Sequence, residues 1–226
     1  KRQLTSARRI INKTDPTAFA YVEKVKEVLG KGFENKENEL FNLSYVIKMG
    51  SYNDKYLNLA ASYLEYLGTE QYTPEQLKEE FYKLGCQFSM SAGGQRSAIS
   101  FSGLSKNMQA TMQLFEDVVK NAKPNQQALD NLISDILKSR ENAKHNQNAN
   151  VSYLVNYCIY ENNSPVFATF LSEAELKAIT PEFLIQKLQD WLTYKPYVVY
   201  YGPDSYENVV KAINETHRMT NLKDVP

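Results

Sequence analysis

The chain contains 226 residues, and its 26 basic side chains balance 26 acidic ones at a formal net charge of zero. Because these charges are scattered, the chain offers no basic surface for nucleic acids and no general attraction to anionic membranes. No apolar run approaches the length of a membrane span, so we expect no transmembrane segment. The length suits one large domain that buries a sizeable core.

Residues 1–33 are expected to form a lead-in to this domain. Their polar and basic beginning is followed by a predicted helix over residues 15–29, which a pair of glycines ends. The chain begins at Lys1 without an initiating methionine or a signal peptide. We therefore interpret it as a piece of a longer protein, and its compartment stays unknown. The main domain is expected over residues 34–226.

The main domain is predicted to begin with a strand over residues 41–49, because apolar side chains occupy every second position. A helix is predicted over residues 56–67, where apolar residues recur at steps of three and four until Gly68. The sequence Thr73-Pro74-Glu75-Gln76 then combines an N-cap, a proline at the first helical position and a capping-box glutamine. This combination predicts a second helix, which runs to Leu84.

The middle of the chain is predicted to form a hairpin and two helices. Two short strands, residues 87–92 and 96–103, are joined at Gly93-Gly94. The two helices are separated at Lys123-Pro124-Asn125. Apolar residues at helical spacing predict their core faces, which are Met108, Met112, Phe115, Val118 and Val119 in the first, and Leu129, Leu132, Ile133, Ile136 and Leu137 in the second.

The last third of the chain is predicted to be mostly helical. An exposed polar stretch over residues 145–150 precedes a helix over 151–160, and two further helices begin near residues 171 and 180. The continuous apolar run of residues 197–201 predicts a buried strand. Asp204-Ser205-Tyr206-Glu207 is interpreted as a capping box that opens a helix to about His217.

This order of elements resembles one domain of the M16 (pitrilysin/insulinase) zinc peptidases. The resemblance rests on the helix over 56–67, the Gly68-Thr69 turn, the second helix and the entry into a strand at Leu84-Gly85. It extends over roughly residues 40–217. It implies an α+β fold of the LuxS/MPP type, in which a mixed or antiparallel β-sheet has helices packed on one side.

In active members of this family the first helix carries the zinc motif His-x-x-Glu-His. When Leu64-Glu65 is aligned with that motif, its two histidine positions fall on Ser62 and Tyr66. Glu65 occupies the general-base position, but a serine and a tyrosine do not replace the imidazole ligands that hydrolysis requires. We therefore expect no catalytic residue, no metal site and no cofactor in this chain, and zinc only in the catalytic half of the parent protein.

The resemblance also points to two further places. The third zinc ligand of active members, a glutamate, would fall near Asp135 or Glu141, and the sequence does not choose between them. Active members lay the substrate backbone along the strand that follows Leu84-Gly85, where an Asn-Ala pair stands. The matching segment here lacks that pair and is a possible peptide-contact strand formed by Gln87, Phe88, Ser89, Met90 and Ser91.

Three other groupings have simpler interpretations. Glu141 and His145 lie four apart, a spacing that can bind a metal but more commonly makes an ion pair or hydrogen bond. The serines of residues 96–103 lack the G-x-S-x-G elbow of a nucleophile. Cys86 and Cys158 are expected to be free, buried thiols, with a single disulfide as the alternative.

The resemblance implies a non-catalytic domain, the first of the C-terminal half of an M16-type zinc metalloendopeptidase. Such a domain would form part of the chamber that encloses a peptide substrate and would dock the catalytic half, in the same chain or in a partner subunit. The alternative is a proteolytically inactive M16-fold scaffold or assembly subunit. A third possibility is an independent hydrolase that uses Glu65 with an unrecognised metal.

Overall fold

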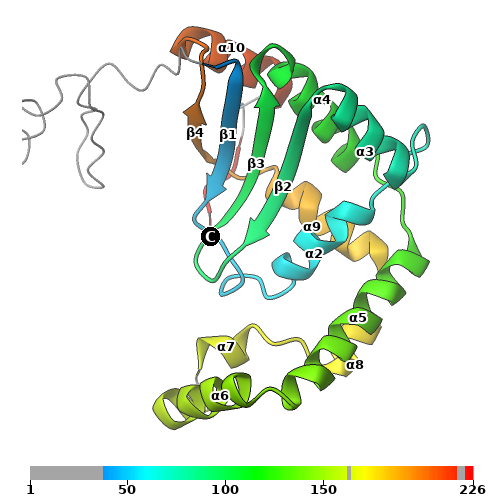
Figure 1. The fold of residues 1–226 in the computed structure, drawn as a ribbon, viewed down its shortest axis with the longest axis vertical. Helices are drawn as coiled ribbons and strands as arrows, with labels where there is room; N and C mark the ends of the chain where they lie inside the picture. The colour runs from blue at the N-terminus through cyan, green and yellow to red at the C-terminus, as the bar shows by residue number, and fades with distance from the viewer. Residues whose placement is uncertain (1–37, 162–163, 218–221, 226) are drawn as a thin grey trace, which may run out of the picture.

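The structure is a computed structural model that describes residues 38–161, 164–217 and 222–225 (Figure 1). The expected lead-in over residues 1–33, with its helix, lies outside the described residues. The sheet has the order β2-β3-β1-β4, and every neighbouring pair is antiparallel. Its strands are β1 (Leu40–Ile47), β2 (Cys86–Ala92), β3 (Ser97–Leu104) and β4 (Tyr197–Tyr201).

The described helices follow the predicted order closely. None of them is long and apolar enough to cross the hydrocarbon core of a bilayer. They are α2 (Leu57–Tyr63), α3 (Pro74–Lys83), α4 (Met108–Lys120), α5 (Gln126–Lys144), α6 (Gln147–Tyr160), α7 (Pro165–Ala168), α8 (Glu173–Ala178), α9 (Pro181–Trp191) and α10 (Tyr206–His217), with 3-10 turns η1 (Leu64–Tyr66) and η2 (Ser105–Asn107).

Helices cover one face of the sheet, and no described helix covers the other, here called the open face (Figure 1). The apolar side chains of β1 that were expected to alternate do so: Phe41, Leu43, Tyr45 and Ile47 are buried beneath the helices. This alternation fits a sheet with a single packed face. The predicted α+β class, with helices on one side of the sheet, is confirmed, and the sheet is antiparallel rather than mixed.

A buried tryptophan ties the last part of the core to the hairpin. The indole Nε1 of Trp191, in α9, donates to the Ser97 hydroxyl over 2.6 Å, and that hydroxyl donates to the Met49 carbonyl over 2.6 Å. Both side chains are 1% exposed. The two hydrogen bonds satisfy the polar groups that burial would otherwise penalise.

A backbone clamp holds the loop after β1 against the hairpin. The N–H groups of Ser51 and Tyr52 donate to the carbonyls of Gly93 and Gly94 over 2.8 and 2.9 Å. A Cβ at Gly50 would lie 2.2 Å from the Gly93 oxygen, so no larger residue fits this close approach. The clamp positions the start of α2 and the tip of the β2–β3 hairpin together.

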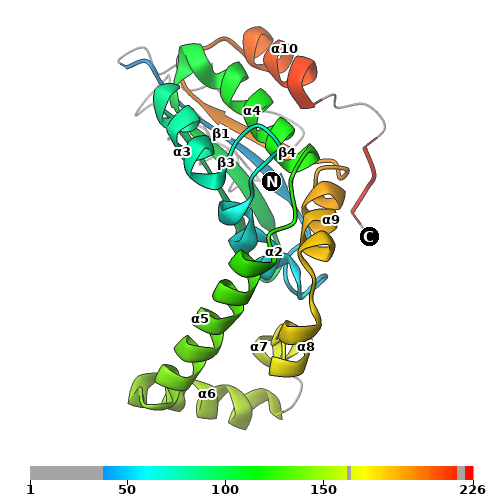
Figure 2. The ribbon, with the colours of Figure 1, turned by 90° about the vertical axis from the view of Figure 1, so that its right-hand side faces the viewer.

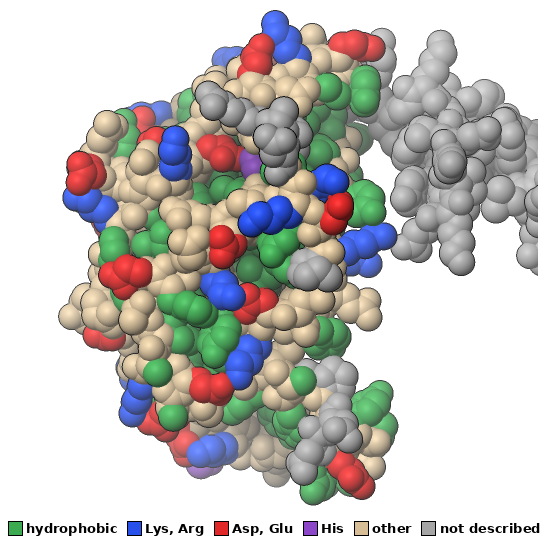
Figure 3. All heavy atoms as spheres, turned by 180° about the vertical axis from the view of Figure 1, so that it is seen from behind, with side chains coloured by type: hydrophobic (Ala, Val, Ile, Leu, Met, Phe, Trp, Pro, Cys, Tyr) green, Lys and Arg blue, Asp and Glu red, His purple; other side chains and the backbone are tan. Residues whose placement is uncertain are grey.

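The chain divides into a body and an arm (Figures 1 and 2). The body consists of the sheet with α2, α3, α4, α9 and α10. The arm consists of the second half of α5 with α6, α7 and α8, and it projects away from the sheet (Figure 2). Figure 3, a view from behind, shows charges of both signs interspersed over the body and hydrophobic side chains at the tip of the arm.

The predicted core face of the long helix is correct only for its first half. Leu129 and Ile133 are buried, whereas Leu132, Ile136 and Leu137 are half-buried. The reason is geometric, because α5 starts in the core and then leaves the body as part of the arm (Figure 2).

The prediction of a buried strand over residues 197–201 is wrong. Strand β4 lies at the edge of the sheet, and Tyr197, Val198, Val199 and Tyr201 are between 40 and 58% exposed. A continuous apolar run fits a central strand, but the run itself does not fix how many neighbours a strand has. Here β1 is the only described strand that pairs with β4.

The cap of the last helix also differs from the expected capping box. The Ser205 hydroxyl accepts the N–H of Asn208 over 3.4 Å. Asp204 instead accepts hydrogen bonds from the hydroxyls of Ser105 and Tyr200, over 2.5 and 3.0 Å. The carboxylate therefore joins the end of β4 to the loop after β3.

Candidate functional site

The three aligned motif positions are all solvent-exposed. Ser62 belongs to α2, and its hydroxyl donates back to the Asn58 carbonyl over 3.2 Å. Glu65 and Tyr66 belong to the 3-10 turn η1, into which α2 tightens at Leu64. The predicted helix over 56–67 is therefore two segments, and the motif positions lie across their junction.

These residues do not fit a catalytic zinc. The two ligands of an inverted zinc motif must share one helix face, as positions four apart do in an α-helix. A 3-10 turn has about 3.0 residues per turn instead of 3.6 and rotates Tyr66 away from the face of Ser62. Neither side chain has an imidazole nitrogen or a thiolate, the usual donors to zinc beside carboxylates. Among the described residues, no group of three or more His, Cys, Asp or Glu side chains is arranged to hold a metal.

The two positions suggested for a third ligand have surface partners instead. Asp135 lies 3.7 Å from the ammonium of Lys138, and Glu141 lies 2.6 Å from that of Lys144. Both acids belong to the second half of α5, which projects from the body. Glu141 pairs with Lys144, and His145 is the exposed C-cap residue of α5.

A tyrosine at one of the two unspecified positions of the motif fixes the end of α2. The fully buried Tyr63 donates its hydroxyl to the Asn125 carbonyl over 3.1 Å and accepts the Asn125 N–H over 2.9 Å. Burial raises the pKa of this phenol. The three- and four-residue spacing over residues 56–67 puts Tyr63 on the apolar face of the predicted helix. It gives no signal for the double hydrogen bond, because Asn125 lies in a distant loop.

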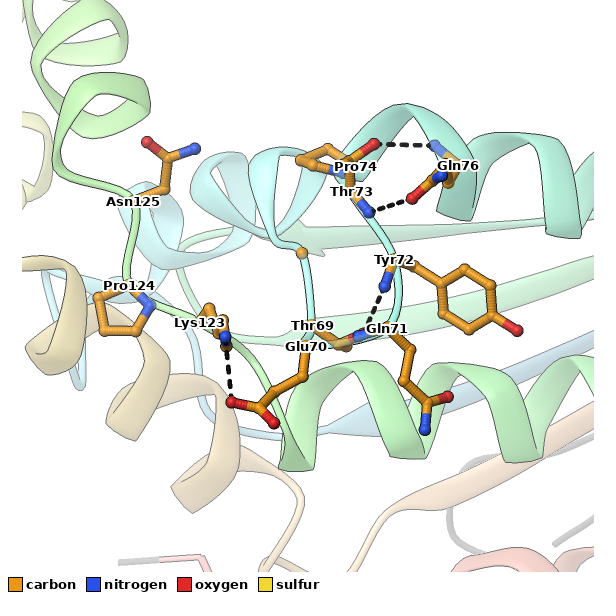
Figure 4. Close-up of a pocket in the computed structure, with 11 residues that line it drawn as sticks. Thr69, Glu70, Gln71, Tyr72, Thr73, Pro74, Gln76, Lys123, Pro124 and Asn125 are labelled. Atoms are coloured by element: carbon orange, nitrogen blue, oxygen red, sulfur yellow. Dashed lines mark hydrogen bonds and ion pairs between the residues drawn. The ribbon is translucent and has the colours of Figure 1, made fainter.

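A shallow pocket of about 260 Å³ opens beside the Tyr63–Asn125 contact, between residues 68–76 and 123–125 (Figure 4). Its two walls are joined where the Lys123 N–H donates to the Gly68 carbonyl over 2.9 Å and the Lys123 ammonium approaches Glu70 at 3.0 Å. The predicted capping box is present, with Thr73 and Gln76 each bonded to the other's backbone. Four of the pocket's polar side chains are thus engaged locally: Glu70 and Lys123 with each other, and Thr73 and Gln76 with backbone groups.

The predicted peptide-contact residues form one edge of the sheet. Strand β2 pairs with β3 on one side, and no described strand pairs with its other side. Gln87, Ser89 and Ser91 are exposed on the open face. Phe88 and Met90 are half-buried against the core. The centre of the Phe88 ring lies 4.8 Å from that of Phe81 and 5.1 Å from that of Phe115. An edge of this kind presents unpaired backbone groups to an extended chain.

The cysteines are separated by burial as well as by sequence. Cys86 is buried at the start of β2, whereas Cys158 is exposed on α6, and both are free thiols. The expectation of free thiols is therefore confirmed for both residues, but the expected burial is correct only for Cys86 and wrong for Cys158, which lies on an exposed helix of the arm.

The family model of the insulinase peptidases (Peptidase family M16) matches residues 33–166, which is more than half of the chain. The chain belongs to the M16 peptidase family. The resemblance read from the sequence is therefore confirmed. A second model, described as an uncharacterized protein conserved in bacteria, matches residues 1–30, which lie outside the described structure. No curated protein matches the chain.

Solved structures support the M16 fold of the described residues. The periplasmic protease PqqL from Escherichia coli has a TM-score of 0.70 at 14% identity, over 88% of this chain and 22% of that protein. An inactive M16 peptidase domain from Pseudomonas fluorescens has a TM-score of 0.67 at 18% identity, over 84% of this chain and 48% of that one.

A third structure extends the comparison. The ferredoxin protease FusC, solved in complex with Arabidopsis ferredoxin, has a TM-score of 0.68 at 11% identity, over 84% of this chain and 21% of that protein. The M16 chain described here therefore spans between a fifth and a half of these three proteins.

Proposed function

We propose that this chain is a non-catalytic domain of an M16-type zinc metallopeptidase, where it walls the peptide chamber and docks the catalytic half. One observation carries the proposal. The positions that the resemblance aligns with the two zinc-binding histidines hold Ser62 and Tyr66, and the second of them lies in a 3-10 turn instead of the same helix.

The edge strand β2 supports a contact role for this domain. Its free edge offers backbone donors and acceptors to an extended peptide, in the manner of strand addition. The side chains of Gln87, Ser89 and Ser91 on the open face are small or uncharged, so they would tolerate many peptide sequences.

The size of related proteins is also compatible with this role. The chain matches only part of PqqL and FusC, both of which are described as proteases. A catalytic partner half, in the same chain or in another subunit, would bring the zinc and the general base.

The second candidate is an inactive scaffold or assembly subunit of M16 fold. The exposed apolar surface of α6 is compatible with it, as with docking of a catalytic half, because surfaces of this kind mark protein contacts. The partner of the chain distinguishes the two candidates. A peptidase requires a partner half with an intact His-x-x-Glu-His motif, and a scaffold does not.

Metal analysis tests the first part of the proposal. After dialysis against zinc, the chain should retain no stoichiometric zinc by mass spectrometry and should cleave no peptide. One tightly held zinc per chain that is lost in Glu65→Gln would contradict the proposal and would favour the independent hydrolase.

Kinetics on the native protease test the assignment of halves. Glu65→Gln should leave kcat nearly unchanged, because Glu65 has no activated water to deprotonate. Glu79→Gln, at an exposed carboxylate on α3, is the matched control. A loss of roughly a hundredfold in kcat, the size of a general-base effect, with an unchanged circular dichroism spectrum would place Glu65 in the catalytic half.

Hydrogen exchange tests the contact role of β2. Adding peptide to the native protease should slow exchange over Gln87–Ser91, and β4 provides an internal control as the opposite edge of the same sheet. Unchanged exchange in β2, with protection confined to other domains, would reduce this domain to a spacer.

A further inference from the structure

The open face of the sheet has a polar half and an apolar half. Paired residues of antiparallel strands point to the same face, so the strand pairing shows which side chains lie on the open face. On β2 and β3 they are uncharged and mostly hydroxyl-bearing, namely Gln87, Ser89, Ser91, Ala98, Ser100 and Ser102. On β1 and β4 the apolar ones form a surface that we call the edge patch, namely Leu40, Val46, Tyr197, Val199 and Tyr201.

The edge patch is exposed over two neighbouring strands at one side of the sheet (Figure 1). Leu40, Tyr197, Val199 and Tyr201 are between 49 and 58% exposed. Val198 points to the packed face, as its partner Tyr45 does, and is not part of the patch. The apolar face of a sheet is normally packed against another layer of secondary structure. The patch therefore calls for a cover.

The sequence places an amphipathic segment directly before β1. Residues 15–29, for which a helix is predicted, lie outside the described residues. At 3.6 residues per turn, six apolar side chains of this helix would lie within an arc of about 120°, namely Ala18, Tyr21, Val22, Val25, Val28 and Leu29. Its charged side chains lie outside that arc, namely Glu23, Lys24, Lys26 and Glu27. A helix of this kind has one side to bury.

We propose that residues 15–29 cover the edge patch as a helix that runs antiparallel to β1. The place where the segment joins the domain is the first argument, because β1 itself carries part of the patch. Residues 30–39 connect the two and can span at most about 33 Å. An antiparallel helix would end near Leu40, so the connection would cross little more than the roughly 10 Å between packed layers.

Length and charge support this orientation. The predicted helix would be about 22 Å long, close to the roughly 26 Å of the eight-residue strand β1. Antiparallel packing puts Asp15 near Lys48, an exposed cation that lies 5.0 Å from the centre of the Tyr197 ring. The reverse direction would bring Lys26 and Lys31 towards Lys48 and would use up nearly all of the reach of residues 30–39.

The covalent connection favours this segment over a separate partner. A short connection gives an effective concentration on the order of millimolar, which a separate protein must exceed to compete. The M16 model matches from residue 33 onward, so the placement of residues 15–29 does not follow from the family. The inference holds for a protease and for a scaffold alike. It leaves the polar half of the open face and the free edge of β2 accessible.

Hydrogen exchange on the full chain tests the contact. Amides of residues 15–29 should exchange slowly in the wild type. Val199→Glu should speed their exchange roughly tenfold or more, because a carboxylate would be buried in an apolar contact. Val199 is 58% exposed, so the body should keep its circular dichroism signal above 250 nm. Ser89→Glu, at an exposed serine on the polar half of the same face, is the matched control and should leave the exchange unchanged.

Disulfide cross-linking tests the orientation. With Leu29 over the Tyr201 end of the patch, Val25 lies over Val199. In a Cys158→Ser background, which removes the exposed thiol, Val25→Cys with Val199→Cys should form an intramolecular disulfide under mild oxidation. Glu27→Cys with Val199→Cys is the control and should remain reduced, because position 27 lies on the opposite side of the helix.

Four outcomes would overturn the proposal. The first is exchange over residues 15–29 as fast as in an unstructured chain. The second is slow exchange that Val199→Glu does not change, and the third is equal cross-linking of the two cysteine pairs. The fourth is protection that appears only as the concentration rises, which would identify a second copy of the chain as the cover.

Discussion

The body and the arm of this molecule use similar side chains in opposite ways. The body buries its largest residues completely, among them Trp191, Tyr45 and Phe101. The arm carries comparable aromatic and aliphatic residues on α6, yet none of them is buried. The difference shows that the fold is stabilised in the body, whereas the arm displays apolar area without contributing much to stability.

The connection between the two regions is narrow and partly polar. Leu176 of α8 is buried, and Glu175 of the same helix pairs with Lys55 in the loop before α2. Within the arm, the Arg140 guanidinium donates to the Leu171 carbonyl over 2.7 Å and lies 4.0 Å from the centre of the Phe170 ring. Substitutions should therefore affect the two regions very differently, and the following predictions are ordered by expected size.

The largest effect is expected at the tryptophan of the body. Trp191→Ala should lower the free energy of unfolding by about 3–5 kcal/mol, because it empties a large buried volume and removes the donor to Ser97. Tyr82→Ala, at an 85% exposed aromatic residue, should change it by less than about 0.5 kcal/mol. Urea denaturation measures both, and equal losses would show that burial does not separate these sites.

A smaller loss is expected at the backbone clamp. Gly50→Ala should lower the free energy of unfolding by about 1–3 kcal/mol, because its Cβ would overlap the Gly93 carbonyl oxygen and push the loop away from the hairpin. Gly93→Ala is the control, since its Cβ would meet nothing closer than 3.4 Å. Thermal denaturation compares the two variants. An unchanged melting temperature for Gly50→Ala would mean that the loop and the hairpin can move apart without loss of stability.

The ion pair between body and arm should appear as a pH dependence. The hydrogen bond from Lys55, followed by those from Ser172, lowers the pKa of Glu175 from 4.5 to about 2. Because the folded pKa is below the unfolded one, the pair's stabilisation is present above pH 4.5 and is lost as the pH falls towards 2. Its size should be small, since both partners are solvent-accessible.

Carboxyl NMR titration checks this prediction. Lys55→Met should raise the pKa of Glu175 towards 4.5, whereas Lys177→Met, which removes the partner of Glu173, should leave it nearly unchanged. A Glu175 pKa that does not change in Lys55→Met would show that the ion pair does not hold the arm to the body at this point.

The smallest effect on stability is expected in the arm itself. At concentrations below any self-association, Leu154→Ser should change the free energy of unfolding by less than about 0.5 kcal/mol. Leu184→Ala in the body, at a fully buried leucine, should lower the free energy of unfolding by about 2–5 kcal/mol. Urea denaturation of both variants compares the two regions at the same residue type. A large loss for Leu154→Ser would show that α6 is part of the core.

Local signals in the sequence predicted much of this fold. The Thr73–Gln76 capping box and the alternation in β1 depend on neighbouring residues, and both occur as expected. Burial in β4 and in the second half of α5 depends on distant partners, so the sequence pattern could not determine it.

The candidate site divides in the same way. The motif positions Ser62, Glu65 and Tyr66 could be found by resemblance, but the turn that separates them could not. That turn follows Tyr63, which is held by Asn125 from a loop about sixty residues away. The pocket beside it is likewise built from two segments far apart in sequence, 68–76 and 123–125.

The position of β1 in the sheet has a consequence for how the chain folds. Strand β1 pairs with β3 along its whole length, but its other neighbour is β4, residues 197–201. The pairing of Tyr45 with Val198 can therefore form only after β4 has been synthesised. The β2–β3 hairpin can form soon after synthesis, whereas closing the sheet requires a loop of about 150 residues to be ordered first. During translation, one side of β1 therefore stays unpaired until the ribosome has made nearly the entire domain. That interval is when the nascent chain is most exposed to mispairing, and chaperone dependence should concentrate there.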